Sequence, residues 1–352
     1  MGLRLIIFLL LCPVIAQAKP KIVTVTDTPT VVEKGGARRI FISGFAGQVV
    51  VLPGKSTEIL VKATRYVEGD DALNNAGDLS EVLRQIAVKA TNNAGTIEIR
   101  TILPPNRSDW TKWAQGKNIP QVKLEVSAPD NMNLEIYWAR GDVKVTKWKA
   151  GVVITHQTGK LTLEDISGDV TARTMYGIAR FENIKGSMSI ENFASQLNVG
   201  QVTGKLKLRT FSGETQIRKI LGNSVISTQK ASVVTQDTQG PMEIQTGIAA
   251  ISIANHRGSI RGQTDTGSVT AKLTGQIDAR FNSNSGALLI SIPRSSRADV
   301  SLSTNKGDLK APKNLDHKRT SAGKIVRGRL SGSESGAIRM NSDAGDINLR
   351  VL

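Results

Sequence analysis

Glycine recurs at nine-residue intervals through the middle of this chain. In residues 165–186, DISGDVTARTMYGIARFENIKG, it stands at positions 168, 177 and 186. Extended from residue 159 to residue 267, the register has thirteen slots, of which ten are glycine and three are serine or alanine. A fixed period of this kind indicates one supersecondary unit stacked many times.

The residues between the glycine slots alternate in polarity. Positions two and four places after a slot are apolar in eleven of thirteen cases each, and polar residues lie between them, as in Leu206-Lys207-Leu208. This period of two predicts short strands with one buried face, and the glycine lies at the turn between strands. Such strands bury their apolar face only when copies stack. The chain is therefore predicted to be all-β, a β-solenoid (β-helix) of nine-residue strand-turn units with about eighteen residues per coil.

A third apolar position follows seven places after the slot in the first half of the repeat. We expect these residues to point inward as a further anchor: Ile166, Met175, Ile184, Phe193, Val202, Phe211 and Ile220. After about residue 222 the position becomes polar, which predicts a cross-section that narrows or opens. The turns lack the repeated aspartate of calcium-binding nonapeptides, so neither a metal nor a cofactor is predicted.

The first eighteen residues, MGLRLIIFLLLCPVIAQA, are typical of a secretory signal peptide. Ala16-Gln17-Ala18 is an A-x-A cleavage site, and the apolar run is too short to span a bilayer. Cys12 as a lipoprotein anchor is less favoured, because Leu11 precedes it and Pro13 follows. We expect an exported protein of the periplasm, the cell surface or the medium, with no transmembrane segment in the mature chain.

Residues 19–138 lack the period and are predicted to form a β-rich N-terminal cap with one short helix. The helix signal is Asp78 as cap with Glu81 three residues later. Such a cap would cover the open strand edges of the first coil. Residues 139–352 are predicted to be the solenoid, closed by strands in segments 286–293, 305–312 and 344–351.

Four segments carry a family resemblance. They are VKLEVSAPDNMNLEIYWARGDV (122–143), SGDV (167–170), KGDL (306–309) and AGDINLRV (344–351). With these the chain resembles the bacterial putative-adhesin β-solenoid family, exported proteins with a domain of unknown function. The resemblance implies a β-solenoid outside the cytoplasm and brings no known catalytic residues. The chain departs from the family in lacking the Asp after Gly in most central units.

The formal net charge is +16, or +15 without Arg4 of the signal peptide. Such an excess attracts anionic surfaces, which outside the cytoplasm are lipid head groups, acidic polysaccharides and cell-wall polymers rather than nucleic acid. The candidate polyanion-binding residues are Lys205, Lys207, Arg209, Lys310, Lys313, Lys318, Arg319, Lys324, Arg327 and Arg329. The alternative is a merely solvated surface.

All four tryptophans lie between residues 110 and 148. Trp110 and Trp113 are candidates for stacking on glycans, whereas Trp138 and Trp148 are expected to pack between cap and solenoid. Exposed Trp would suit an adhesin, but packing is the commoner role of such a large side chain.

Signals for catalysis are weak. The three histidines show no metal-binding spacing, and no G-x-S-x-G motif is present. Possible acid and base pairs for glycan cleavage are Asp70-Asp71 and Glu164, Glu182 and Glu191, although solvated residues on a loop or an outer face are favoured. The sequence thus predicts a non-enzymatic adhesin-like or envelope scaffold that binds anionic polymers or glycans. The rival hypothesis is a polysaccharide-active β-helix enzyme, which the short units between residues 159 and 267 disfavour. The oligomeric state stays open.

Overall fold

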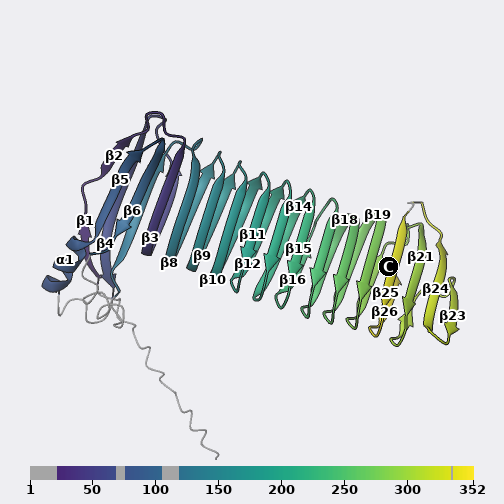
Figure 1. Ribbon diagram of the computed structural model, residues 1–352. Helices are drawn as coiled ribbons and strands as arrows, with labels where there is room; N and C mark the ends of the chain where they lie inside the picture. Colours follow the sequence, from purple (N-terminus) through teal and green to yellow (C-terminus); the bar gives the residue numbers. More distant parts are fainter. Residues whose placement is uncertain (1–21, 69–75, 105–118, 334–335) are drawn as a thin grey trace, which may run out of the picture.

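The computed structural model describes residues 22–68, 76–104, 119–333 and 336–352. Within them the protein is an elongated stack of β-coils with a single helix near its N-terminal end (Figure 1). The prediction of an all-β solenoid with one short helix is confirmed. The predicted signal peptide, residues 1–18, lies outside the described residues.

The central coils are built from parallel strands stacked in register. These are β9 (Val152–Ile166), β10 (Val170–Lys185), β11 (Met188–Asn192), β12 (Gln196–Thr203), β13 (Leu206–Thr210), β14 (Glu214–Leu221), β15 (Ser224–Thr228), β16 (Ser232–Gln236), β17 (Met242–Thr246), β18 (Ile251–Thr264) and β19 (Val269–Ser283). Val170 lies opposite Met188, and Met188 lies opposite Leu206. Backbone groups at each level are therefore paired with the coils above and below.

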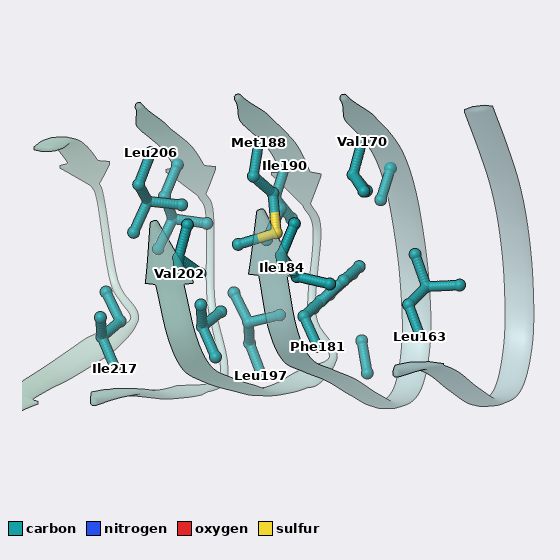
Figure 2. Close-up of a cluster of buried hydrophobic side chains, with 14 of the residues drawn as sticks. Leu163, Val170, Phe181, Ile184, Met188, Ile190, Leu197, Val202, Leu206 and Ile217 are labelled. Carbon is teal, nitrogen blue, oxygen red and sulfur yellow. The ribbon is translucent and has the colours of Figure 1, made fainter. Parts of the chain in front are cut away.

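Each coil contributes one extended segment to each of two faces of the stack. Face A contains residues 170–174 of β10, then β11, β13, β15 and β17, and residues 260–264 of β18. Face B contains residues 178–185 of β10, then β12, β14 and β16, and residues 251–254 of β18. Between the faces lies a continuous apolar core, which Figure 2 shows around Phe181, Ile184 and Met188.

The two corners of a coil differ in how the chain turns. At one corner a non-glycine residue adopts a left-handed conformation, with φ between +50° and +57° at Lys147, Asp165, Asn183, Gln201, Lys219, Asp237 and Asn255. At the other corner a polar side chain is buried, and these stack as Thr174, Asn192, Thr210, Thr228, Thr246, Thr264 and Ser283. We call this stack the hydroxyl column. The polar groups of this column are hydrogen-bonded inside the corner. Thr228 Oγ1, for example, donates to the carbonyl oxygen of Ala231 at 2.7 Å.

The expected third inward anchor exists at only one of these corners. Ile166, Ile184, Val202 and Ile220 are buried beside the left-handed corner. Met175, Phe193 and Phe211 are exposed, so the prediction that they point inward is wrong. Consecutive positions of this set fall on opposite corners of the coil. At the second corner the hydroxyl column fills the interior, which directs the next side chain outward.

Beyond residue 222 the buried anchor position continues with polar residues. Thr238 and His256 are buried there, and Thr238 Oγ1 lies 3.0 Å from His256 Nδ1. His256 Nε2 donates to the carbonyl oxygen of Ser259 at 3.3 Å, so Nδ1 accepts from the threonine. The core therefore becomes partly polar at this corner instead of losing its inward residues.

At the N-terminal end the strands are β1 (Ile22–Thr26), β2 (Thr30–Glu33), β3 (Arg39–Pro53), β4 (Glu58–Glu68), β5 (Ala87–Asn93), β6 (Thr96–Ile102), β7 (Gln121–Ala128) and β8 (Asn133–Trp148). β3 forms a whole coil, parallel to β6 and β7 on one side and to β8 on the other. β4 and β5 run antiparallel along the outer edges of β7 and β6. β1 and β2 pair with β4 in turn, so the predicted covering of strand edges is present.

Helix α1 (Ala76–Gln85) begins two residues before the expected cap, Asp78, and packs against β1 and β4 with Leu79 and Leu83 buried. Trp138 and Trp148 are fully buried between the cap strands and the coils. Trp148 Nε1 donates to the carbonyl oxygen of Met132 at 2.8 Å. The packing role predicted for these two residues is confirmed.

The C-terminal strands are β20 (Leu288–Ile292), β21 (Ala298–Thr304), β22 (Leu309–Lys310), β23 (Asp316–Thr320), β24 (Gly323–Leu330), β25 (Ala337–Ser342) and β26 (Ile347–Val351). The last coil lies inside the stack. β25 lies between β19 and β21, and β26 lies between β20 and β22. β24 and β23 extend face A as antiparallel strands beyond β21 (Figure 1).

Candidate functional site

Face A carries a line of outward basic side chains. The strand register places the following residues side by side across successive strands, in this order: Lys207, Val225, Glu243, Arg261, Arg280, Arg339, Ser301 and Arg327. We call its five basic members, Lys207, Arg261, Arg280, Arg339 and Arg327, the basic column, and all five are exposed. At about 4.8 Å per strand, the line extends about 34 Å along the solenoid.

The basic column joins two groups that are far apart in the sequence. Lys207 belongs to the predicted cluster on β13, whereas Arg327 belongs to the predicted basic segment near the C-terminus. Arg209 follows Lys207 on β13, Lys205 directly precedes that strand, and both are exposed with Lys207. Arg261, Arg280 and Arg339 fill the interval between the two groups. Sequence reasoning missed them because each is an isolated residue in its own segment.

Acidic neighbours balance part of this charge. Arg280 pairs with Asp278 at 3.9 Å, and Glu243 lies on the strand next to Arg261 without forming an ion pair. Arg261, Arg339 and Arg327 form no ion pair with any described residue. Like charges on adjacent strands destabilise a sheet. The run of three arginines therefore does not serve the stability of the fold.

Three of the other predicted basic residues are engaged in ion pairs. Lys318 pairs with Asp316 at 3.0 Å, Lys324 with Asp308 at 2.5 Å and Arg329 with Asp299 at 2.6 Å. Hydrogen bonds from Arg329 and Lys324 lower the pKa of the Asp299 and Asp308 carboxyls. Lys310, Lys313 and Arg319 are exposed and form no ion pair within the described ranges.

A row of amides and hydroxyls borders the basic column toward the hydroxyl-column corner. Asn341 Nδ2 donates to Asn282 Oδ1 at 3.2 Å, and Ser303 Oγ donates to Asn341 Oδ1 at 2.8 Å. With Gln263 and Asn305 these residues line a polar hollow of about 300 Å³. The column thus has a neutral hydrogen-bonding border on this side, suited to the hydroxyl groups of a polymer.

A second feature, which we call the corner groove, lies on the outside of the hydroxyl-column corner. It has a volume of about 720 Å³, and Met175, Phe193 and Phe211 line it on successive coils. Arg173, Glu191 and Arg209 form its rim on face A, where Arg173 pairs with Glu191 at 2.8 Å. In the sequence the seventh-place residues alternate between Ile or Val and Met or Phe, but this alternation does not by itself show which corner is exposed.

The aromatic side chains of this corner contact one another. Phe193 and Phe211 are stacked, with ring centroids 5.3 Å apart and planes 5° from parallel. Tyr176 meets Phe193 edge to face at 5.8 Å. Lys230 Nζ lies 5.7 Å from the centroid of the Phe211 ring.

Of the carboxylates considered for catalysis, Glu164 and Glu182 lie opposite each other on adjacent strands of face B, and Asp70 and Asp71 lie outside the described residues. Glu164 is 3.6 Å from Lys144, and Glu182 is 3.7 Å from Arg180. Gly200 lies beside Glu182 and, having no side chain, leaves room for a hollow of about 590 Å³. Arg218 also lines this hollow. Each carboxylate thus has a cationic neighbour.

The remaining candidates contribute no further site. Burial lowers the pKa of His156 and of His256, and both rings are hydrogen-bonded inside the coils. Within the described ranges no group of three His, Cys, Asp or Glu side chains is arranged to hold a metal ion. No helix among those residues has the length and apolarity needed to cross a membrane. Trp110 and Trp113 lie outside the described residues.

Comparisons with known proteins give one family match. A family model described as Toastrack DUF4097 matches residues 72–350. No curated protein matches the sequence. A crystal structure of a putative cell adhesion protein from Clostridium sporogenes ATCC 15579 is 10% identical, with 95% of this chain and all of that chain covered and a TM-score of 0.21. A putative lipid binding protein from Parabacteroides distasonis ATCC 8503 is also 10% identical, with 94% and 97% covered and a TM-score of 0.33.

Proposed function

The chain belongs to the Toastrack DUF4097 family, and from this premise we propose that it is a non-enzymatic adhesin-like or envelope scaffold protein that binds anionic polymers. The binding surface is face A, with the basic column at its centre. The protein works outside the cytoplasm, in the periplasm, on the cell surface or in the medium. The sequence of residues 1–18 supports this location, as does a net charge suited to anionic envelope polymers.

The alignment of the basic column is the observation that carries this proposal. A linear polyanion carries charges at regular intervals. The cations of the basic column are likewise regularly placed, because the distance between any two of them along the solenoid is a whole number of strand spacings. The solenoid is held by continuous backbone pairing, so these cations are preorganised and little ordering accompanies binding. The amide row beside the column can hydrogen-bond to the same polymer.

We further infer that the eighteen-residue coil of two nine-residue units is the repeat of the central solenoid. Hydrogen bonds between side chains at this offset support it, such as Thr174 to Asn192 at 2.9 Å and Asn255 to Asp237 at 3.0 Å. The division into a signal peptide (1–18), a cap (19–138) and a solenoid (139–352) stays a prediction. β8 runs through the boundary between cap and solenoid, and β3 of the cap already has the form of a coil.

An enzymatic role as a polysaccharide-cleaving β-helix finds less support. Polysaccharide-cleaving β-helices wall their substrate groove with long insertions. The units between residues 159 and 267, which carry Glu164 and Glu182, have none. Hydrolysis of polygalacturonate that disappears in Glu182→Gln would favour the enzyme.

The test uses polygalacturonate as the anionic polymer and compares two triple variants of equal charge. One variant carries Arg261→Gln, Arg280→Gln and Arg339→Gln in the basic column. Its matched control carries Arg218→Gln, Lys272→Gln and Arg350→Gln, three exposed cations on face B. Calorimetric titration at low and at physiological salt gives the dissociation constant of each protein.

We expect the face A variant to bind about tenfold more weakly, since three exposed charge contacts contribute roughly 0.5 kcal/mol each. Its salt dependence should also be shallower. The face B control should stay close to the parent. Equal weakening in both variants would show that only net charge matters, and absence of binding to the polymer would reject the proposal.

A further inference from the structure

The corner groove presents large apolar side chains to solvent on three successive coils. Exposed fractions are 38% for Met175, 48% for Tyr176, 45% for Phe193 and 38% for Phe211. Among the described residues, no segment covers them. A contiguous patch of this kind, hollowed and bordered by polar residues, is typical of a ligand-binding surface. Its volume of about 720 Å³ lies within the common range for ligand sites, about 300–1,000 Å³.

The orientation of the rings restricts what can bind. Because Phe193 and Phe211 are stacked on each other, each covers a face of its neighbour. Tyr176 meets Phe193 in a T-shaped contact, and Lys230 lies over the Phe211 ring. A sugar stacks on a free aromatic face, whereas Phe193 and Phe211 each cover one face of the other. A flexible aliphatic chain can instead follow the ring edges and the thioether of Met175 along the groove.

The charge at the groove is unequal along its length. At the Met175 end, Arg173 is neutralised by Glu191. At the Phe211 end, Arg209 lines the groove and Lys230 lies beside the ring, and neither forms an ion pair with a described residue. An anionic group at the end of an apolar chain would meet both cations there.

We propose that the corner groove binds a single-chain anionic amphiphile of the fatty-acid class. The acyl chain lies along Met175, Phe193 and Phe211, and the carboxylate lies between Arg209 and Lys230. This activity goes beyond polymer binding and uses none of the five residues of the basic column. Met175, Phe193 and Phe211 line the groove in single file, one on each coil, which suits one chain rather than the flat surface of a bilayer.

The experiment measures binding of palmitate to the full chain by displacement of cis-parinaric acid, whose fluorescence rises in apolar sites. Hexadecanol, which has the same chain without the carboxylate, is the ligand control. The variants are Phe193→Gln, Phe211→Gln and Arg209→Gln. Ile178→Gln is the matched control, because Ile178 is 44% exposed on the coil that carries Met175 but lies on face B.

We expect Phe193→Gln and Phe211→Gln each to weaken palmitate binding at least about fivefold while Ile178→Gln leaves it unchanged. Arg209→Gln should weaken palmitate but leave hexadecanol unaffected. All these side chains are exposed, so circular dichroism should match the parent, and two phenylalanine variants keep the test valid if one misfolds. Polygalacturonate binding in the phenylalanine variants should be unchanged, which separates this site from the basic column.

Three results would overturn the proposal. The first is absence of palmitate binding below its micelle concentration. The second is loss of binding to phosphatidylglycerol vesicles, but not to free palmitate, in the phenylalanine variants, which would make the groove a membrane contact. The third is a dimer of the parent that dissociates in Phe193→Gln without any change in palmitate affinity, which would assign the groove to a second copy.

Discussion

Glycine is required at Gly204 and at Gly168 for two different physical reasons. Gly204 has φ +143°, and a Cβ there would overlap the carbonyl oxygen of Gly186 in the coil below. Gly168 has no left-handed conformation, yet its Cβ would overlap the carbonyl oxygen of Ala150. Close stacking of coils therefore demands glycine even where the backbone angle does not. Ser195 occupies an equivalent slot with a side chain and is buried.

The first prediction compares the smallest possible changes at two such slots. Gly204→Ala should lower the free energy of unfolding by about 1–3 kcal/mol, because the new Cβ strains the backbone and pushes on the neighbouring coil. Ser195→Ala should change it little, since the slot already holds a Cβ. Urea unfolding of both variants and the parent measures the difference. Equal midpoints for the two variants would contradict the stacking argument.

The second prediction concerns the buried histidine of the second half. Burial lowers the pKa of His256 below its usual 6.5, so the ring is neutral when folded and takes up a proton more readily when unfolded. The contribution of the neutral ring to the free energy of unfolding is therefore fully present above pH 6.5. It decreases as the pH drops through that value, by at most about 1.4 kcal/mol per pH unit per histidine. Urea midpoints between neutral and mildly acidic pH test this in the parent and in His256→Gln. The glutamine can keep both hydrogen bonds, and the variant should show a shallower pH dependence. Parallel profiles would exclude His256 as a source of the acid sensitivity.

At the scale of elements, the hydroxyl column decides how each coil turns from face A to face B. Its one amide, Asn192, donates to Thr210 Oγ1 at 3.0 Å and to the carbonyl oxygen of Ser195 at 2.9 Å, and it accepts from Thr174 and from the Ser195 amide. These groups are buried, so removal of their common partner would leave several of them unsatisfied.

The third prediction follows from that arrangement. Asn192→Leu should destabilise the fold by about 3 kcal/mol, because it leaves buried donors and acceptors of two neighbouring coils without a hydrogen-bond partner. Asn192→Thr should cost about 1 kcal/mol or less, since threonine is the residue of the same column in the next four coils. Thermal and urea unfolding of both variants provide the measurement. A leucine variant as stable as the threonine variant would show that the column does not depend on its hydrogen bonds.

The sequence was most informative where neighbours in the fold are a fixed distance apart in the chain. The period gave the strands, the turns and the buried positions such as Leu206 and Leu208. It could not show that Met175, Phe193 and Phe211 point outward, because apolar character alone does not distinguish a filled core from a groove. The alignment of Arg280 with Arg339 could not be predicted from the sequence either, because the coil that holds Arg339 is inserted out of sequence order.

At the scale of the whole molecule, the stack should tolerate removal of a complete coil but not of half a coil. The fourth prediction deletes residues 205–222, which joins Gly204 to Asn223 and brings β11 beside β15 and β12 beside β16. Apolar positions and both corner types keep their alignment, so the variant should unfold cooperatively and be shorter by about 5 Å in small-angle scattering.

Deletion of residues 205–213 is the control for that prediction. It would place strands of face B under strands of face A and align left-handed corners with the hydroxyl column. The buried side chains of one coil would then lie against side chains of the next coil that belong to the other face. This variant should lose its cooperative transition and expose apolar surface to a hydrophobic dye. Equal tolerance of both deletions would mean that the coil is not the unit of stability.

The insertion of β3 and of the β25–β26 coil one level inside the stack has a consequence for the order of folding. As the ribosome releases the chain from its N-terminus, β3 finds one of its neighbours only when β8 has been made, since Arg39 pairs with Asn133. At the other end β21 pairs with β25, so its coil cannot dock until almost the last residue is available. Contacts this distant form slowly, whereas central strands pair with the next coil along. Folding should therefore nucleate in the central coils. The inserted coils at both ends should dock last and stabilise the coils that have already formed.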